Sequence, residues 1–395
     1  MLDLWQQLAK EAINGGNVEG LETRDRGLHR YPLYLSDNSR PFALPSLERE
    51  GFVNILEEEN LPGKMTALSH FAVQCDPLQF RPSMAPYPIF FHARSRWEPD
   101  LLNEVRKMQS PVDLGLDPYS LGLWKGEVSK AQPPFDEIGS LLPNFKIFRL
   151  TSLPYDLAGA NDVQQLGVLM ASTVQLLKDF EGSYPLETLV GHLSFQISVS
   201  PQNFVSIAKL QSFRVMLLKL FEELGLPVQK MPPVFSLTSP RYLCSREPSM
   251  NLLRITSGLF SSILGGAKGY FHYGHDLFSK SNNGSRLSRN ASLVLELEAQ
   301  LAKVDDPTVG SWMVDELSHQ LCEKAWSFFR EIEGKGGLVA ALQAGWLQEE
   351  IERSGEKEWD HYLHQKKVLV GVNQFVLNHN LNDQYPLLKE EDVLS

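Results

Sequence analysis

Residues 288–337 read SRNASLVLELEAQLAKVDDPTVGSWMVDELSHQLCEKAWSFFREIEGKGG, and the interpretation of the whole chain begins from this stretch. Leu293, Leu297 and Leu301 recur at a four-residue spacing, which predicts the buried face of a helix that ends at an Asp-Asp-Pro sequence. A second apolar face of helical period follows and ends at a glycine pair; its members are Leu317, Leu321, Ala325, Phe328 and Ile332. We therefore expect two packed helices joined by a turn.

Composition places the chain among globular proteins of the cytoplasm. The 395 residues include 37 Lys and Arg against 48 Asp and Glu, a net charge of −11 that argues against nucleic acid or an anionic membrane as a partner. No apolar run reaches the roughly 18–20 residues of a membrane span, and Asp3 stands where a leader peptide would carry bases. Cys75, Cys244 and Cys322 are far apart, so we expect neither a disulfide nor a zinc site.

Strand-like and helix-like segments alternate through most of the chain. Helical periodicity fills residues 161–180, 203–224 and 249–264. Strand-like apolar runs lie at residues 67–73, 88–92, 112–116, 145–150, 189–199, 234–237 and 267–271, with an eighth near 368–372. This alternation predicts a parallel sheet. Because no glycine-rich fingerprint follows a strand, a (β/α)8 TIM-type barrel is favoured over a doubly wound nucleotide-binding sheet.

The first fifty residues differ from this pattern and predict an arm. A short amphipathic helix over residues 5–13 is followed by glycines and then by an extended piece that Pro32 interrupts. Such a segment cannot bury a core alone, so it lies either on its own domain or on a partner chain. We expect an N-terminal arm over residues 1–50, a barrel domain over 51–375 and a C-terminal tail over 376–395.

Two short polar motifs invite a functional interpretation. The glycine-rich run at residues 265–269 lacks the spacing of a phosphate-binding loop, so it predicts a helix cap and a tight turn. His272, His275 and Asp276 follow a strand-like run, and in a barrel they would lie on the catalytic face. No further ligand stands at a recognisable spacing, so no metal site is expected.

The order of residues in the opening stretch resembles that of a known family. Arg289-Asn290, Asp306-Pro307, Gly310-Ser311-Trp312 and Lys324-Ala325-Trp326 occur in the order found in the adenosylcobalamin-dependent acyl-CoA mutases, and the methylmalonyl-CoA mutases are the most similar. The order of residues in the arm also resembles the N-terminal arm of the non-catalytic small subunits of that family. The resemblance implies a barrel that encloses the substrate and an arm that wraps around a partner chain.

The chain departs from the family where the resemblance bears on catalysis. His192 stands where the catalytic chains carry an arginine that opens a strand, before the matching Leu193-Ser194-Phe195. Phe235 falls where they carry the histidine that donates to the thioester carbonyl, although the alignment there can slip by a residue or two. The resemblance therefore implies no catalytic residues. His192, His272 and His275 are weak substrate-binding candidates if the chain is active.

The family's Asp-x-His-x-x-Gly motif, whose histidine ligates cobalt, does not occur, and no cobalamin domain is expected. The resemblance thus implies a non-catalytic small (β) subunit that pairs as a heterodimer with a catalytic chain, which isomerises methylmalonyl-CoA to succinyl-CoA. Adenosylcobalamin would belong to the assembled mutase rather than to this chain alone, and acyl-CoA remains a possible ligand. The alternative is the substrate barrel of a split acyl-CoA mutase with a separate cobalamin-binding subunit. A third alternative is an independent acyl-CoA-binding module.

Overall fold

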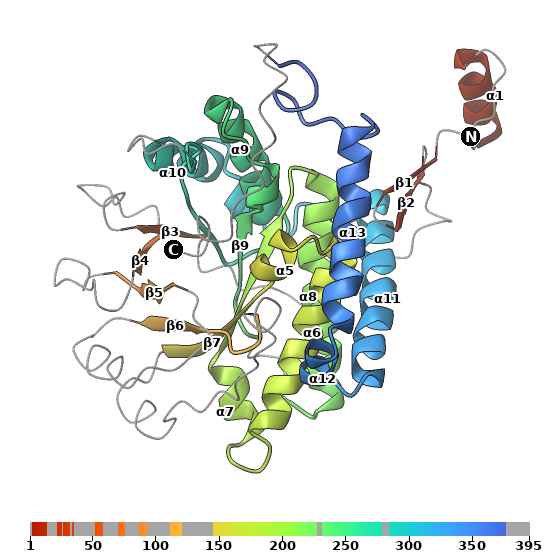
Figure 1. Cartoon of the computed structure of the whole chain (residues 1–395). Helices are drawn as coiled ribbons and strands as arrows, with labels where there is room; N and C mark the ends of the chain where they lie inside the picture. Colours follow the sequence, from red (N-terminus) through yellow and green to blue (C-terminus); the bar gives the residue numbers. More distant parts are fainter. Residues whose placement is uncertain are drawn as a thin grey trace.

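The computed structural model describes residues 2–13, 22–25, 27–31, 34, 52–57, 70–75, 87–92, 111–120, 145–226, 231–278 and 284–376. Its centre is a closed barrel of eight parallel strands in the order β10-β3-β4-β5-β6-β7-β8-β9 (Figure 1). The strands are β3 (Val53–Glu57), β4 (His70–Cys75), β5 (Ile89–Phe91), β6 (Val112–Leu116), β7 (Phe145–Thr151), β8 (Leu193–Val199), β9 (Val234–Thr238) and β10 (Gly269–Phe271). The expected TIM-type barrel is confirmed.

The eighth strand is not the one that the sequence indicates. β3 closes the barrel by pairing with β4 and β10. The sequence does not predict this strand, because the polar residues Asn54 and Glu57 interrupt its apolar run. The predicted strand near 368–372 is wrong. Gly371 has φ 76°, and the Asn373 side chain accepts a hydrogen bond from the Leu369 amide at 2.7 Å, so this valine-rich segment forms a turn.

Most helices that follow the strands agree with the sequence pattern. α6 (Asp162–Asp179), α8 (Asn203–Glu223) and α9 (Pro248–Leu264) confirm the three predicted helices within two residues at each end. Asn161 and Gln164 form a capping box that fixes the start of α6. The predicted strand over 189–199 is too long, because its first residues belong to α7 (Leu186–Gly191). Two short elements, α5 (Leu153–Leu157) and the 3-10 turn η6 (Pro240–Tyr242), follow β7 and β9.

The helix predicted from Leu293, Leu297 and Leu301 differs from the observed one. α10 (Gly284–Leu293) continues into a π-helical turn, η7 (Val294–Glu298), and ends before a 3-10 turn, η8 (Leu301–Lys303). Leu297 is 38% exposed, so the leucine stripe is not the buried face. The buried face is polar and comprises Ser288, Ser292 and Glu296.

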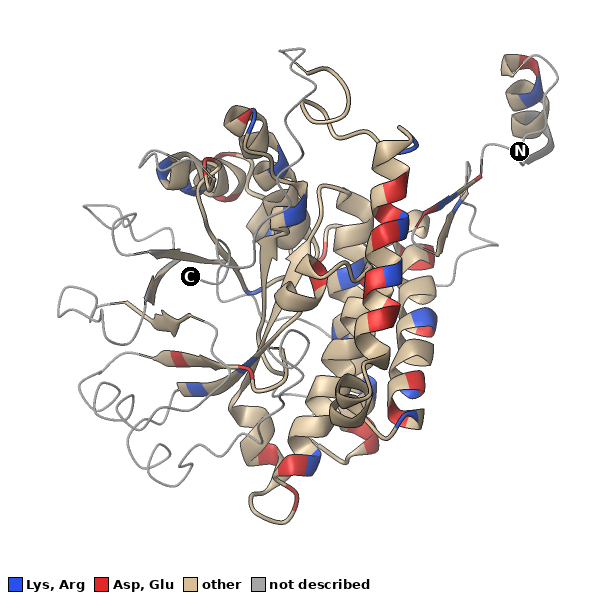
Figure 2. Cartoon of the chain, viewed as in Figure 1, with Lys and Arg blue, Asp and Glu red and all other residues tan. Residues whose placement is uncertain are grey.

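Three helices form an outer layer, stacked beside α6 and α8 in Figure 1: α11 (Trp312–Gly334), α12 (Leu338–Gln343) and α13 (Trp346–Leu363). All five apolar residues predicted for the inner face of α11 are buried. Gly336 and Gly337, with φ of 96° and 89°, end that helix in a conformation that glycine favours. Acidic and basic side chains alternate along the outer faces of α11 and α13 (Figure 2), as expected for solvated surfaces.

The N-terminal arm has two parts with different surroundings. β1 (Thr23–Asp25) and β2 (Leu28–Arg30) form an antiparallel ribbon that lies on α11, with Leu28 only 1% exposed. The helix α1 (Leu2–Ala12) lies beyond the ribbon, apart from the barrel and its helices (Figure 1). The predicted helix at the start of the arm is therefore confirmed.

None of the helices in the described ranges combines the length and apolar character needed to cross a membrane. Most of the proposed tail, residues 377–395, lies outside the described residues.

Candidate functional site

The interior of the barrel, its bore, has one apolar half and one polar half. Alternation along each strand directs every second side chain inward. On β3, β4, β5, β9 and β10 these inward residues form one buried apolar cluster: Ile55, Ala72, Phe90, Phe235, Leu237 and Phe271. On β6, β7 and β8 the inward residues include Asp113, Arg149, Thr151, Ser194 and Gln196, which are also buried. The strand positions alone thus place six apolar side chains opposite the polar side chains of β6, β7 and β8.

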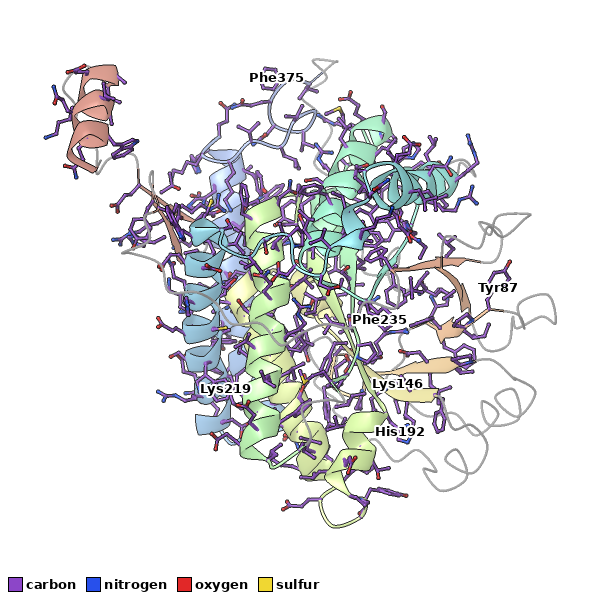
Figure 3. All side chains as sticks on the ribbon, turned by 180° about the vertical axis from the view of Figure 1, so that it is seen from behind. Tyr87, Lys146, His192, Lys219, Phe235 and Phe375 are labelled. Carbon is purple, nitrogen blue, oxygen red and sulfur yellow. The ribbon has the colours of Figure 1, made fainter. Side chains whose placement is uncertain are left out.

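Aromatic rings meet across the bore. β5 and β9 lie four places apart in the ring of eight strands, so Phe90 and Phe235 come from opposite sides of the barrel. Their ring centres are nevertheless only 5.0 Å apart, with an edge-to-face angle of 83°. Phe271 completes the triad at 5.6 Å from Phe90 and 6.0 Å from Phe235. Side chains therefore close the bore at this level (Phe235 is labelled in Figure 3).

A buried ion pair forms the polar half at the same level. Asp113 Oδ1 lies 3.0 Å from Arg149 Nη1, and both side chains are at most 4% exposed. Ser194 donates to Asp113 Oδ2 at 2.6 Å, and Arg149 also donates to the Phe91 carbonyl. The guanidinium carbon lies 4.9 Å from the centre of the Phe271 ring. The charge of Arg149 is thus compensated by a carboxylate and an aromatic face.

Gly115 makes this arrangement possible. It has φ 64° in an irregular part of β6, between Asp113 and Leu116. A Cβ at this position would lie 2.7 Å from Arg149 Nη2, so a larger residue would displace the guanidinium. The sequence Val-Asp-Leu-Gly-Leu therefore supplies both the carboxylate and the space for its partner.

A second polar cluster lies outside the bore, between the barrel wall and α10. Asn54 of β3 is its centre, because its Oδ1 accepts from His272 Nε2 at 3.0 Å and from Ser292 Oγ at 2.5 Å. Its Nδ2 donates to Glu296 Oε2 at 3.3 Å. Ser288 and Ser292 of α10 and Glu296 of η7 follow one another at four-residue steps, so they share one face of the helix. The buried face of α10 and η7 is polar because it covers the polar side chains of Asn54 and His272 on the outside of the barrel.

Burial shifts the titration of two groups in this cluster. Desolvation, reinforced by the nearby Arg289, lowers the pKa of His272 to about 3. Desolvation raises the pKa of Glu296 to about 6, although its hydrogen bond from Asn54 opposes the shift. His272 is therefore neutral at pH 7 and acts as a structural donor, with its Nδ1 buried and without a hydrogen-bond partner.

His192 lies at the amino end of the barrel, near Lys146 (Figure 3). Its Nδ1 donates to the Phe145 carbonyl at 3.0 Å, and its ring lies 4.7 Å from that of Phe145. Desolvation lowers the pKa of His192, and the positive charge of Lys146 acts in the same direction. The ring is therefore neutral at pH 7 and a poor holder of a carboxylate.

The three candidate histidines do not form one site. His192 precedes β8 at the amino end, whereas His272 and His275 follow β10 at the carboxyl end. His275 serves a structural turn, in which its carbonyl accepts from Asn251 at 2.8 Å. No cluster of three potential metal ligands occurs among the residues that the structure describes.

The sequence interpretation missed the polar half of the bore. Its signal was present, because Asp113 and Arg149 interrupt two otherwise apolar strand-like runs. An ionisable residue in the middle of a buried strand needs a partner of opposite charge. The pairing itself could not be assigned, because the two residues are 36 positions apart.

Comparison with known proteins agrees with this architecture. The family model described as methylmalonyl-CoA mutase matches residues 138–393, well over half of the chain. The chain belongs to the methylmalonyl-CoA mutase family. Relatives named as small subunits are also found within that family. The methylmalonyl-CoA mutase small subunit of Streptomyces virginiae is 31% identical over 271 residues, covering 67% of this chain and 44% of the relative.

Two further members of the methylmalonyl-CoA mutase family match at lower identity. The probable methylmalonyl-CoA mutase small subunit of Mycobacterium bovis is 26% identical over 278 residues, with 67% and 44% of the two chains covered. The methylmalonyl-CoA mutase of Escherichia coli is 25% identical over 258 residues, with 64% and 36% covered. The matched part spans less than half the length of each of these relatives.

Proposed function

We propose that this chain is a non-catalytic barrel subunit of an adenosylcobalamin-dependent mutase. Its partner would be a catalytic chain that interconverts methylmalonyl-CoA and succinyl-CoA. The contact between Phe90 and Phe235 carries the proposal, because these rings from opposite strands occupy the axis along which a family substrate would be enclosed. Membership of the family and the likeness to chains named as small subunits support the same role.

The residues that stand at the two catalytic positions of the family do not fit the rearrangement. The reaction needs a donor at the thioester carbonyl and a positive charge for the carboxylate of the substrate. Phe235 cannot donate a hydrogen bond, and His192 is neutral at pH 7 because its pKa is lowered. Losing one such polar contact costs about 10²–10³-fold in rate. We therefore assign no step of the reaction to this chain, and we assign the cofactor to the assembled enzyme.

One observation bears on the alternative, a split enzyme with a separate cobalamin-binding chain. Arg149 is a cation inside the bore, and a carboxylate substrate requires one. Asp113 already compensates its charge at 3.0 Å, and Phe271 covers one side of the guanidinium. Recruiting Arg149 would leave Asp113 buried without its partner, which is costly. The buried ion pair therefore supports a non-catalytic subunit more than it supports a split enzyme.

The first test concerns catalysis. The purified chain is mixed with a candidate cobalamin-binding chain, adenosylcobalamin and methylmalonyl-CoA, and succinyl-CoA is followed. We expect no turnover, and no corrinoid absorbance after the chain alone is desalted. Turnover that disappears in His192→Ala would establish the split enzyme instead.

The second test concerns the partner. The chain is co-expressed with a catalytic methylmalonyl-CoA mutase chain and analysed by size exclusion. We expect a stable one-to-one complex that retains mutase activity. Deletion of residues 1–21 removes α1 but keeps the ribbon and its buried Leu28. Circular dichroism should show that this variant is folded, and its association should be weaker. A complex of unchanged affinity would exclude α1 from the contact.

A further inference from the structure

The helix α13 is held to the rest of the chain in two different ways along its length. Its first half buries Leu347 and Ile351 in the main apolar core. Over residues 354–363, all of which the structure describes, Glu358 is the only buried residue. Trp359, next to it, is 39% exposed. Apolar contacts therefore fix the first half, whereas the buried group of the second half is a carboxylate.

A chain of charges connects Glu358 to the short helix α5. Glu358 Oε2 accepts a hydrogen bond from Arg241 Nη2 at 2.9 Å, and Arg241 Nη1 lies 3.5 Å from Asp156 Oδ1. The Glu358 and Asp156 side chains are 8% and 3% exposed, and Arg241 between them is 19% exposed. Lys367 Nζ also lies 3.4 Å from Glu358 Oε1, but it is shared with Asp25 at 2.7 Å. Arg241 of η6 is therefore the cation that joins α13 to α5.

Asp156 depends on this cation because its carboxylate is incompletely satisfied. Its Oδ1 accepts from Gln165 Nε2 at 3.0 Å, whereas its Oδ2 is buried without a hydrogen-bond partner among the described residues. A buried carboxylate that loses its counter-ion is costly unless it reaches water. Without Arg241, α5 would therefore move so that Asp156 can be hydrated.

α5 lies at the carboxyl end of the bore (α5 and α13 are labelled in Figure 1). It follows β7 directly, and the Leu153 amide donates to Thr151 Oγ1 at 3.1 Å. The Leu153 side chain packs against the apolar cluster that contains Phe90, Phe235 and Phe271. A shift of α5 would therefore lift Leu153 from this cluster and admit water to the bore.

α13 also contacts the turn that follows α5. A Cβ on Gly159 would lie 2.8 Å from the Gly355 Cα, so the two backbones are in close contact. Asn161 Nδ2 donates to Ser354 Oγ at 3.0 Å. Ser354 and Gly355 stand within about one helical turn of Glu358. A displacement of the second half of α13 therefore removes its contacts with both ends of α5 together.

We propose that α5 is a lid on the carboxyl end of the bore and that the second half of α13 is the latch that keeps it closed. The latch is the ion pair of Glu358 with Arg241, through which Asp156 is compensated. Ion pairs exchange for water more readily than apolar packing does, because separated charges regain their hydration. The lid therefore opens locally while the first half of α13 and the main core stay folded. The device lies within one chain, so it does not depend on the proposed subunit function.

The first experiment measures how readily a thiol reagent reaches the bore. In a background in which the native cysteines are serines, Ala72→Cys places a thiol in the apolar cluster of the bore. Ala325→Cys places one in the main core on α11, outside the barrel, and both alanines are fully buried. The rate of labelling by a maleimide reports the opening of each region. We expect Arg241→Met to speed the labelling of Ala72→Cys about tenfold and that of Ala325→Cys less than about twofold.

Arg353→Met is the matched control on the same helix. It breaks an exposed pair with Glu350, whose atoms are 2.5 Å apart, and should change neither rate more than about twofold. Glu358→Gln keeps an acceptor for Arg241 and removes the charge, so we expect a smaller acceleration in the bore, about threefold. Equal acceleration of both thiols would mean global unfolding, and an unchanged rate in the bore would mean that α5 is no lid; either result overturns the proposal. If Arg241→Met does not fold, Glu358→Gln decides by the same criterion.

The last experiment tests the cause of the opening. Combining Asp156→Asn with Arg241→Met removes the buried carboxylate together with its counter-ion. The labelling rate of Ala72→Cys should then return to within about threefold of the parent rate. A double variant that is labelled as fast as Arg241→Met alone would overturn the assignment of the latch to these charges.

Discussion

The bore of the barrel and the α8–α11 groove have opposite characters. In the bore, Phe90 and Phe235 come from opposite strands and meet at 5.0 Å. The groove lies between α8 and α11 on the outside of the barrel, with Val215, Met216, Cys322 and Trp326 among its lining residues. Side chains thus fill the interior at this level, which agrees with the proposed role of a non-catalytic subunit.

The difference also concerns how the two regions contribute to stability. In the bore, every charged or aromatic group described above is buried against a specific partner, so truncation leaves a cavity or an unpaired charge. At the groove, Lys219 is mostly exposed and Trp326 is only partly buried, so truncation removes fewer buried contacts. Variants in the bore should therefore lower the free energy of unfolding more than matched variants at the groove.

Breaking the ion pair of the bore should have the largest effect. Asp113→Ala leaves the Arg149 guanidinium buried without its carboxylate at 3.0 Å. We expect the free energy of unfolding in urea to fall by about 3–5 kcal/mol. The paired variant Asp113→Leu with Arg149→Met is the control, since it removes both charges and should recover much of that loss. A loss below about 1 kcal/mol for Asp113→Ala would mean that water reaches the bore.

Truncating an aromatic ring of the bore comes next. Phe235→Ala removes the ring that Phe90 and Phe271 contact, and we expect a loss of about 3–4 kcal/mol. Trp326→Ala, the matched truncation at the groove, removes a larger but only partly buried side chain and should cost about half as much. Urea unfolding of both variants tests the comparison directly. An equal or larger cost for Trp326→Ala would contradict it.

The polar cluster on the outer wall of the barrel should destabilise the folded chain when the pH falls. The pKa of His272 is about 3 in the folded chain against a usual value of 6.5, so the unfolded chain takes up the proton first. Stability is therefore complete above pH 6.5 and falls progressively as the pH drops toward 3. Between pH 7 and pH 4 the loss from this residue should be about 3 kcal/mol.

His272→Gln keeps an amide donor for Asn54 and removes the titrating ring, so it should lose less stability than the parent chain over that interval. The raised pKa of Glu296, about 6, acts in the opposite direction, because a neutral carboxyl is stabilised in the folded chain as the pH falls below that value. The difference between parent and variant isolates His272. Parallel pH profiles of the two proteins would show that His272 is not buried as described.

The smallest effect should come from the groove. Lys219 is 68% exposed, and its contact with Glu222 at 3.4 Å is an exposed pair one helical turn apart. We expect Lys219→Gln to change the free energy of unfolding by less than about 0.5 kcal/mol. Thermal and urea unfolding check this value. A loss comparable to that of Phe235→Ala would erase the distinction between the two regions.

Local pattern made much of the fold predictable. Periodicity predicts seven strands of the barrel, the helices α6, α8 and α9, and the inner face of α11. It does so because the geometry of a helix or a strand fixes which residues share a face, whatever that face packs against. The glycine pair after α11 was likewise readable, since it ends a helix by its own conformational preference. The family followed from the order of residues in one stretch, and the comparison with known proteins confirmed it.

Three features could be decided only by the tertiary structure. β3 contains Asn54 because the outer wall of the barrel there faces the polar side of α10, and the same contact buries Ser292 in place of Leu297. Asp113 and Arg149 could be recognised as buried charges, but only the pairing of β6 with β7 brings them together across 36 residues. His192 and His272, which the sequence offers as one set, lie at opposite ends of the strands.

The physical reason is the same in each case. Local sequence fixes which residues share a face of a helix or strand, because that depends on backbone geometry alone. What a face meets depends on how the barrel closes, and closure joins β10 to β3 across more than 200 residues of chain. The sequence by itself therefore determined the elements and the family, whereas the tertiary structure decided that aromatic rings fill the bore and that Asp113 pairs with Arg149.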